Sequence, residues 1–118
     1  MDMRYFLTTL LETSGFAVVA AKNGTEGIHH VTARRPDLII LDVMMPQQGG
    51  LLMYRHIKQA PDLKQIPVVM LSAVSQNSFL HSLKMLNTQL PEPLPPPAAY
   101  LEKPPDPDRV LHIIRQII

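Results

Sequence analysis

The stretch that most constrains the fold is an unbroken apolar run that ends on a single carboxylate. Residues 37–42 read Asp-Leu-Ile-Ile-Leu-Asp, so most of them favour β-strands and Asp42 comes last. A strand that is apolar on both faces is buried on both faces, which is typical of a parallel sheet covered by helices. Ligands of open α/β sheets bind at the carboxyl ends of the strands, so Asp42 stands where chemistry is expected.

Helix-like and strand-like patterns alternate along the rest of the chain. Short β-rich runs predict strands over 16–21, 37–42, 66–72 and 98–102. Apolar residues at helical spacing predict helices over 2–14, 25–35, 51–60 and 78–90, and a last helix that runs from a cap at Asp106 or Asp108 to the C-terminus. Asp2 and Gly15 are expected to cap the two ends of the first helix. The alternation predicts an α/β fold with a doubly wound parallel sheet, formed by one domain over residues 1–118.

Composition excludes several classes of protein. The chain has 118 residues, of which 46% are hydrophobic, and this is enough for one globular core. A net charge of +1 gives no basic field that would gather nucleic acid or an anionic membrane surface. No apolar run reaches the roughly 20 residues of a membrane span, and the N-terminus has no signal-peptide pattern. The absence of cysteine excludes disulfides and thiol chemistry, and a reducing, cytoplasmic location is expected.

A carboxylate, a hydroxyl and an ammonium group follow three of the predicted strands. They belong to Asp42, Ser72 and Lys103, and they converge on one edge of the sheet if the strands are parallel neighbours. This set suits phosphoryl chemistry, because a carboxylate can attack phosphorus while a hydroxyl and an ammonium stabilise the equatorial oxygens. A magnesium ion is normally required to bring two anions together.

Three motifs occur in register with this alternation. They are LIILDVMMP over 38–46 followed by Gly50, PVVMLSA over 67–73, and AYLEKP over 99–104. With these motifs, nearly the whole chain resembles the receiver domain of two-component response regulators. The resemblance implies a flavodoxin-like receiver architecture with strand order 2-1-3-4-5. It also implies a phosphoacceptor that is not an enzyme, and that takes its phosphoryl group from a histidine kinase or a histidine phosphotransfer protein.

The resemblance assigns a role to each matching residue. Asp42 resembles the phosphoacceptor, Ser72 the hydroxyl that moves toward the phosphoryl group, and Lys103 the ammonium that contacts it. Tyr100, three positions before the lysine, resembles the aromatic switch residue. The magnesium ligands implied here are Asp42 and the backbone carbonyl of Met44. Pro104 matches a proline that often follows a cis peptide bond and positions the lysine.

The chain departs from the family pattern in two places. In the family, a strand that ends in two acidic residues precedes the first helix, and those acids hold the magnesium. The sequence begins at Met1, past that point, so the first strand and the acidic pair are expected to be absent or supplied by another chain. Their absence would leave two sheet edges exposed, through which two copies could dimerise. The second departure is a Pro-rich insert over 87–97, before the last strand, where the family usually has its fourth helix and a short turn.

Simpler explanations stand beside each of these assignments. An aspartate, a serine or a lysine after a strand is often only a turn, cap or solvated residue, and Tyr100 could be a packing residue. The five histidines lack metal-ligand spacing, and the PxxP pattern over Pro93–Pro96 could be an irregular insert or a peptide ligand. The alternative function is a phosphorylation-independent interaction module that lacks the magnesium site. An enzyme acting on a phosphorylated metabolite would need a glycine-rich loop, and the sequence has none.

Overall fold

The computed structural model describes residues 3–42 and 50–118, in which helices and strands alternate as the sequence predicts. The elements in chain order are α1 (Met3–Thr13), α2 (Gly24–Arg34), β1 (Ile39–Asp42), α3 (Gly50–Gln59), β2 (Val68–Ser72), α4 (Gln76–Asn87), β3 (Ala99–Glu102) and α5 (Pro107–Ile117). The α/β class is therefore confirmed. No helix among the described residues is long and apolar enough to cross a membrane.

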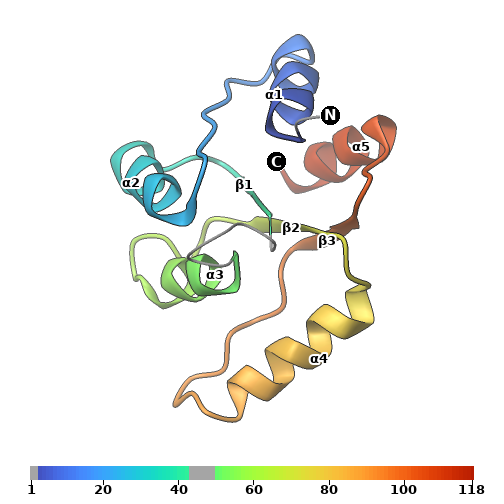
Figure 1. Cartoon of the computed structure of the whole chain (residues 1–118). Helices are drawn as coiled ribbons and strands as arrows, with labels where there is room; N and C mark the ends of the chain where they lie inside the picture. The colour runs from blue at the N-terminus through green and yellow to red at the C-terminus, as the bar shows by residue number, and fades with distance from the viewer. Residues whose placement is uncertain (1–2, 43–49) are drawn as a thin grey trace.

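The sheet consists of three parallel strands in the order β1-β2-β3. Asp42 on β1 lies opposite Leu71 on β2, and Ser72 on β2 lies opposite Glu102 on β3. Because the strands are parallel and in this register, their carboxyl ends meet at one edge (Figure 1). The expected edge for polar side chains is therefore present.

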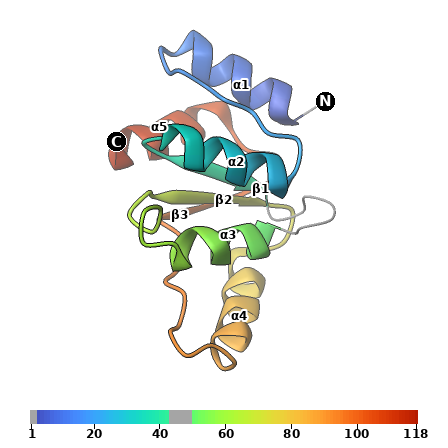
Figure 2. The same ribbon diagram turned by 90° about the vertical axis from the view of Figure 1, so that its left-hand side faces the viewer.

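Helices cover both faces of the sheet. Figure 2 shows α1 and α5 on one side of the strands and α3 and α4 on the other. Alternate residues of β2 point into the two cores, with Val68 and Met70 on the α3 and α4 side and Val69 and Leu71 on the α1 and α5 side. A two-faced apolar strand therefore has the covered position that its sequence predicts.

Local signals set several of the helix ends. The Asn23 side chain accepts a hydrogen bond from Glu26 N–H at 2.9 Å, which caps α2. The Ser75 side chain caps α4 through Ser78 N–H at 3.2 Å. Gly15, just past α1, has φ +97, the left-handed conformation expected of a helix-ending glycine. Asp106 occupies the N-cap position of α5, but its side chain makes no capping hydrogen bond there. The expected cap at Asp2 falls outside the described residues.

The strand predicted over 16–21 is wrong. This segment carries no strand. Its side chains still alternate between core and solvent, since Phe16 and Val18 pack into the α1 and α5 core while Val19 is 50% exposed. A strand requires a hydrogen-bonded neighbour, and among the described residues β1 pairs only with β2. The sequence therefore predicts an extended shape correctly, but the segment has no strand partner here. The five-strand order 2-1-3-4-5 and dimerisation through sheet edges remain predictions.

The fourth helix is present and the Pro-rich segment follows it. Helix α4 begins two residues before the predicted 78–90 and ends at Asn87, so the insert predicted over 87–97 starts at the last residue of this helix. The connection that follows, 88–98, contains neither helix nor strand. Its Leu94 is only 5% exposed and belongs to the core on the α3 and α4 side. The insert is thus packed against the domain rather than replacing the helix.

Candidate functional site

The carboxylate and ammonium groups predicted to meet form an ion pair. Lys103 Nζ lies 2.8 Å from Asp42 Oδ2, a normal charge-assisted hydrogen-bond distance. Asp42 ends β1 and Lys103 follows β3, so the pair spans the middle strand of the sheet. Their side chains are 31% and 23% exposed, and both groups are therefore within reach of a molecule in solution.

The hydroxyl of Ser72 lies on the middle strand but bonds to the next loop. Ser72 is fully buried, and its Oγ accepts a hydrogen bond from Val74 N–H at 3.1 Å. Lys103 N–H donates to the Ser72 carbonyl at 2.8 Å, which ties the residue after β3 to the end of β2. The strand ends therefore place Ser72 beside the ion pair, while its side chain holds the loop that leads to α4.

The side chain of Tyr100 also fastens this loop. Its hydroxyl donates to the carbonyl of Val74 at 2.9 Å, and its ring lies 5.2 Å from the ring of Phe79 on α4. Tyr100 is 8% exposed, so it is a packed residue in this structure. Ser72 and Tyr100 thus hold the two backbone polar groups of the same residue, Val74.

The remaining predicted site residues have different outcomes. The peptide bond between Lys103 and Pro104 is cis, as the resemblance implies. Met44 lies outside the described residues. The roles of both residues remain predictions.

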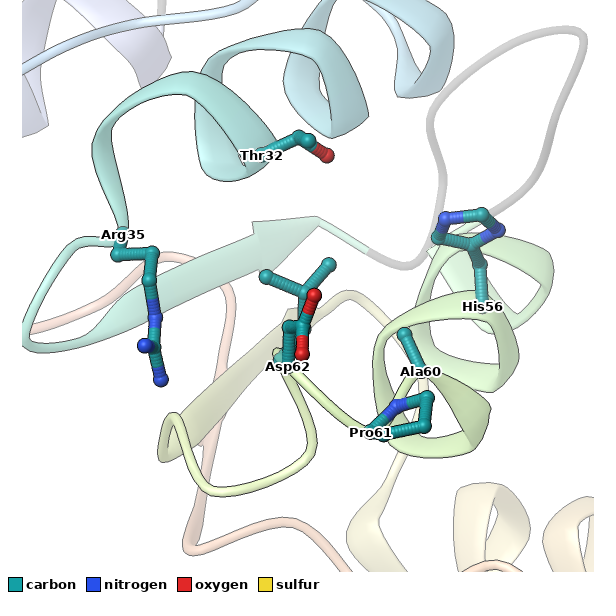
Figure 3. A pocket seen from close by; sticks show the side chains of 7 residues that line it. Thr32, Arg35, His56, Ala60, Pro61 and Asp62 are labelled. Atoms are coloured by element: carbon teal, nitrogen blue, oxygen red, sulfur yellow. The ribbon is translucent and has the colours of Figure 1, made fainter.

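One surface pocket lies away from the ion pair. It has a volume of about 450 Å³ and is lined by Thr32, Arg35, His56, Ala60, Pro61, Asp62 and Leu63 (Figure 3). These residues come from the end of α2, from α3 and from the turn before β2, so the pocket lies near the amino ends of the strands. Its labelled polar side chains are all exposed, and no cluster of buried polar groups marks it as a site.

Two side chains anchor the Pro-rich segment through contacts that the sequence does not predict. Tyr54 of α3 is fully buried and its hydroxyl donates to the carbonyl of Pro95, and burial raises the pKa of Tyr54 to about 12. Asn87 bonds both backbone groups of Leu94. The Tyr54 contact joins residues 41 positions apart, a separation that leaves no local pattern.

The fold and the ion pair define a class of protein, a three-layer α/β domain with opposite charges paired at the carboxyl edge of its parallel strands. The sequence profile described as the response regulator receiver domain matches residues 1–115, and the chain belongs to this family.

Several known proteins are similar to the chain. The polar-differentiation response regulator DivK of Brucella anthropi is 25% identical over 118 residues, which are 100% of this chain and 88% of that protein. The chemotaxis protein CheY4 of Vibrio cholerae has a similar structure, with a TM-score of 0.83 and 22% identity over 100% of this chain and 91% of that one. The receiver domain of a signal transduction histidine kinase from Syntrophus aciditrophicus has a TM-score of 0.76 and 30% identity over 96% of this chain and 80% of that one.

The described residues do not complete a magnesium site. Receiver domains of this family generally bind Mg²⁺. This ion prefers octahedral oxygen coordination and is usually held by one or two carboxylates. Within residues 3–42 and 50–118, no three His, Cys, Asp or Glu side chains are grouped so that they could hold a metal ion. Asp42 Oδ2 instead contacts the ammonium group of Lys103, so magnesium binding by Asp42 and the Met44 carbonyl stays a prediction.

Proposed function

We propose that this receiver domain accepts a phosphoryl group on Asp42 from the phosphohistidine of a histidine kinase or a histidine phosphotransfer protein. The observation that carries the proposal is the partly exposed Asp42–Lys103 pair at the carboxyl edge of the sheet. A carboxylate oxygen of Asp42 attacks phosphorus, the phosphorus–nitrogen bond of the donor breaks, and the released imidazole nitrogen takes a proton. The product is an acyl phosphate on Asp42.

The role of Lys103 follows from its charge and position. Its ammonium group lies 2.8 Å from the carboxylate that would carry the phosphoryl group, so it can stabilise the negative charge on the phosphoryl oxygens. The domain assists its own modification in this way and turns over no separate substrate, so we do not class it as an enzyme. We place this reaction in the cytoplasm, in line with a chain that contains no cysteine.

The signal would leave the site through Val74. The Ser72 hydroxyl accepts a hydrogen bond from Val74 N–H, and the Tyr100 hydroxyl donates one to the Val74 carbonyl. If the Ser72 hydroxyl turns toward a phosphoryl oxygen, the first of these two hydrogen bonds is lost. The loop, and with it the Tyr100 ring, can then take a second arrangement whose population depends on phosphorylation.

The alternative is a phosphorylation-independent interaction module in which the ion pair only holds β1 to the residue after β3. The observation that favours it is that Asp42 already has a cationic partner at 2.8 Å. The two candidates differ in one measurable property, which is whether Asp42 gains a phosphoryl group.

The test is incubation with a small acyl phosphate in a magnesium-containing buffer, followed by intact-mass measurement. We expect the wild type to gain the mass of one phosphoryl group and Asp42→Asn to gain none. Asp37→Asn is the matched control, because Asp37 is exposed and precedes the same strand at its other end. The proposal is wrong if the wild type stays unmodified, or if Asp42→Asn is modified as fully as the control.

A further inference from the structure

The segment between α4 and β3 has an unusual composition and a regular pattern of burial. Four of the five residues over 93–97 are proline, and no bend, helix or strand interrupts them. Leu94 is 5% exposed, Pro97 is half-buried, and Pro93, Pro95 and Pro96 are exposed. In Figure 1 this segment, drawn in orange, passes between the ribbons of α3 and α4 toward β3.

The pattern is the one expected of a polyproline II helix with one edge packed inward. Proline fixes φ near −65° and restricts the residue before it to extended conformations, so this composition favours polyproline II. That helix has 3 residues per turn, so Leu94 and Pro97 share one edge, Pro93 and Pro96 share a second, and Pro95 lies on the third. The edge with Leu94 faces the core, and the other two face solvent.

Hydrogen bonds hold this edge in place. Leu94 N–H donates to Asn87 Oδ1 at 2.8 Å, and Asn87 Nδ2 donates to the Leu94 carbonyl at 3.0 Å. The Tyr54 hydroxyl donates to the Pro95 carbonyl. Just before β3 begins, Ala98 N–H donates to the Val68 carbonyl at 2.9 Å. The segment is therefore ordered before any partner arrives, which removes part of the entropy cost of binding.

We propose that the exposed edges of Pro93, Pro95 and Pro96 form a docking ridge for a partner domain whose groove is lined with aromatic side chains. Grooves of this kind bind polyproline II segments by packing prolines between aromatic rings, and they read two edges of the helix while the third faces away. Here the third edge is the one that Leu94 buries in its own domain. The ridge is independent of phosphoryl transfer, because it shares no residue with the Asp42–Lys103 pair.

A second copy of this chain cannot supply such a groove. The chain has three phenylalanines, three tyrosines and no tryptophan, and all six aromatic residues lie in the described part. Tyr5, at 72% exposure, is the only one of them that is largely exposed, and the other five are buried or half-buried. The groove is therefore supplied by a domain other than the one formed by residues 1–118.

The test is a titration of the ¹⁵N-labelled full chain with purified SH3, WW and EVH1 domains, which are the probes for aromatic polyproline II grooves. Because prolines have no N–H, binding is followed at the amides of Glu92, Leu94 and Ala98. We expect at least one domain to shift these resonances in a saturable way. No saturable shift with any of the three domains would overturn the proposal.

Two variants show whether the ridge itself is recognised. The double variant Pro93→Ala/Pro96→Ala removes one edge, and we expect it to weaken binding by at least about tenfold. Pro91→Ala is the matched control, because Pro91 is exposed but lies at a bend outside the 93–97 segment, and we expect a change of less than about twofold. Equal binding by the double variant and the wild type, with unchanged circular dichroism, would also overturn the proposal.

Discussion

Strands β1 and β2 are similar in sequence and differ in burial. Both are apolar until their last residue, Ile39–Asp42 in one case and Val68–Ser72 in the other. All five residues of β2 are buried, whereas burial alternates along β1, where Ile39 and Leu41 are buried and Ile40 is not. The difference teaches that the burial of a strand depends on the strands beside it as well as on its own residues. Strand β2 pairs on both sides, while β1 pairs, among the described residues, only with β2.

The comparison predicts unequal costs for two core truncations on the same face of the sheet. Leu71 of β2 is 1% exposed in the α1 and α5 core, and Ile40 of β1 is only partly buried against it. We expect Leu71→Ala to lower the free energy of unfolding by roughly 2–5 kcal/mol, because it leaves a closed cavity. Ile40→Ala should cost roughly 1–2 kcal/mol, because solvent already reaches this side chain.

Urea unfolding of the two variants and the wild type measures both costs. Each substitution removes a four-carbon side chain down to one carbon, so the variants control for each other. Equal costs would show that β1 is as well covered as β2 and would remove the distinction between the two strands.

The same contrast separates two connections, 88–98 and 14–23. Asn87 holds both backbone groups of Leu94 in the first, whereas residues 16–21 in the second have no strand partner. We expect Asn87→Ala to lower the free energy of unfolding by roughly 1–3 kcal/mol, because it leaves Leu94 without its two hydrogen bonds. Asn77→Ala, at an exposed position of the same helix, should change it by less than about 0.5 kcal/mol.

Hydrogen exchange locates the effect. We expect the Leu94 amide to exchange slowly in the wild type and in Asn77→Ala, and quickly in Asn87→Ala, while the Val19 amide exchanges quickly in all three. Slow exchange at Leu94 in Asn87→Ala would mean that packing of Leu94 alone holds the segment.

The smallest expected effect concerns Tyr54, which is buried in the core on the α3 and α4 side of the sheet. Burial raises its pKa from the ordinary 10.0 to about 12, so the folded state keeps this proton after the unfolded state has lost it. Stability from this group is fully present below about pH 10 and is lost as the pH rises toward about 12. Tyr54→Phe should therefore flatten the decline in stability over this range, besides costing about 1 kcal/mol for the lost hydrogen bond.

Urea unfolding at about pH 9 and about pH 11 measures this dependence. Tyr5→Phe is the matched control, because Tyr5 is 72% exposed, and it should leave the decline unchanged. An equal decline in the wild type and in Tyr54→Phe would contradict the assignment.

What could be predicted from the sequence follows from how far each signal reaches along the chain. The helices and the three observed strands came from local periodicity, and the meeting of Asp42 with Lys103 came from the rule that parallel strands end together. The strand over 16–21 failed because pairing depends on a neighbour that local hydrophobicity does not reveal. The direction of the Ser72 hydroxyl, toward Val74, and the anchoring of Pro95 by Tyr54 depend on distant packing.

Prolines also bracket the last strand of the sheet. Within the described residues β3 has β2 on one side and no strand on the other, so its outer edge has no strand partner. The strand has four residues, with Pro95–Pro97 shortly before it and Pro104 and Pro105 shortly after it. Proline donates no backbone hydrogen bond, so an incoming chain finds only a short ladder that cannot be lengthened in either direction. Pro95 and Pro96, which belong to the proposed ridge, thereby also help to protect the domain from edge-to-edge aggregation.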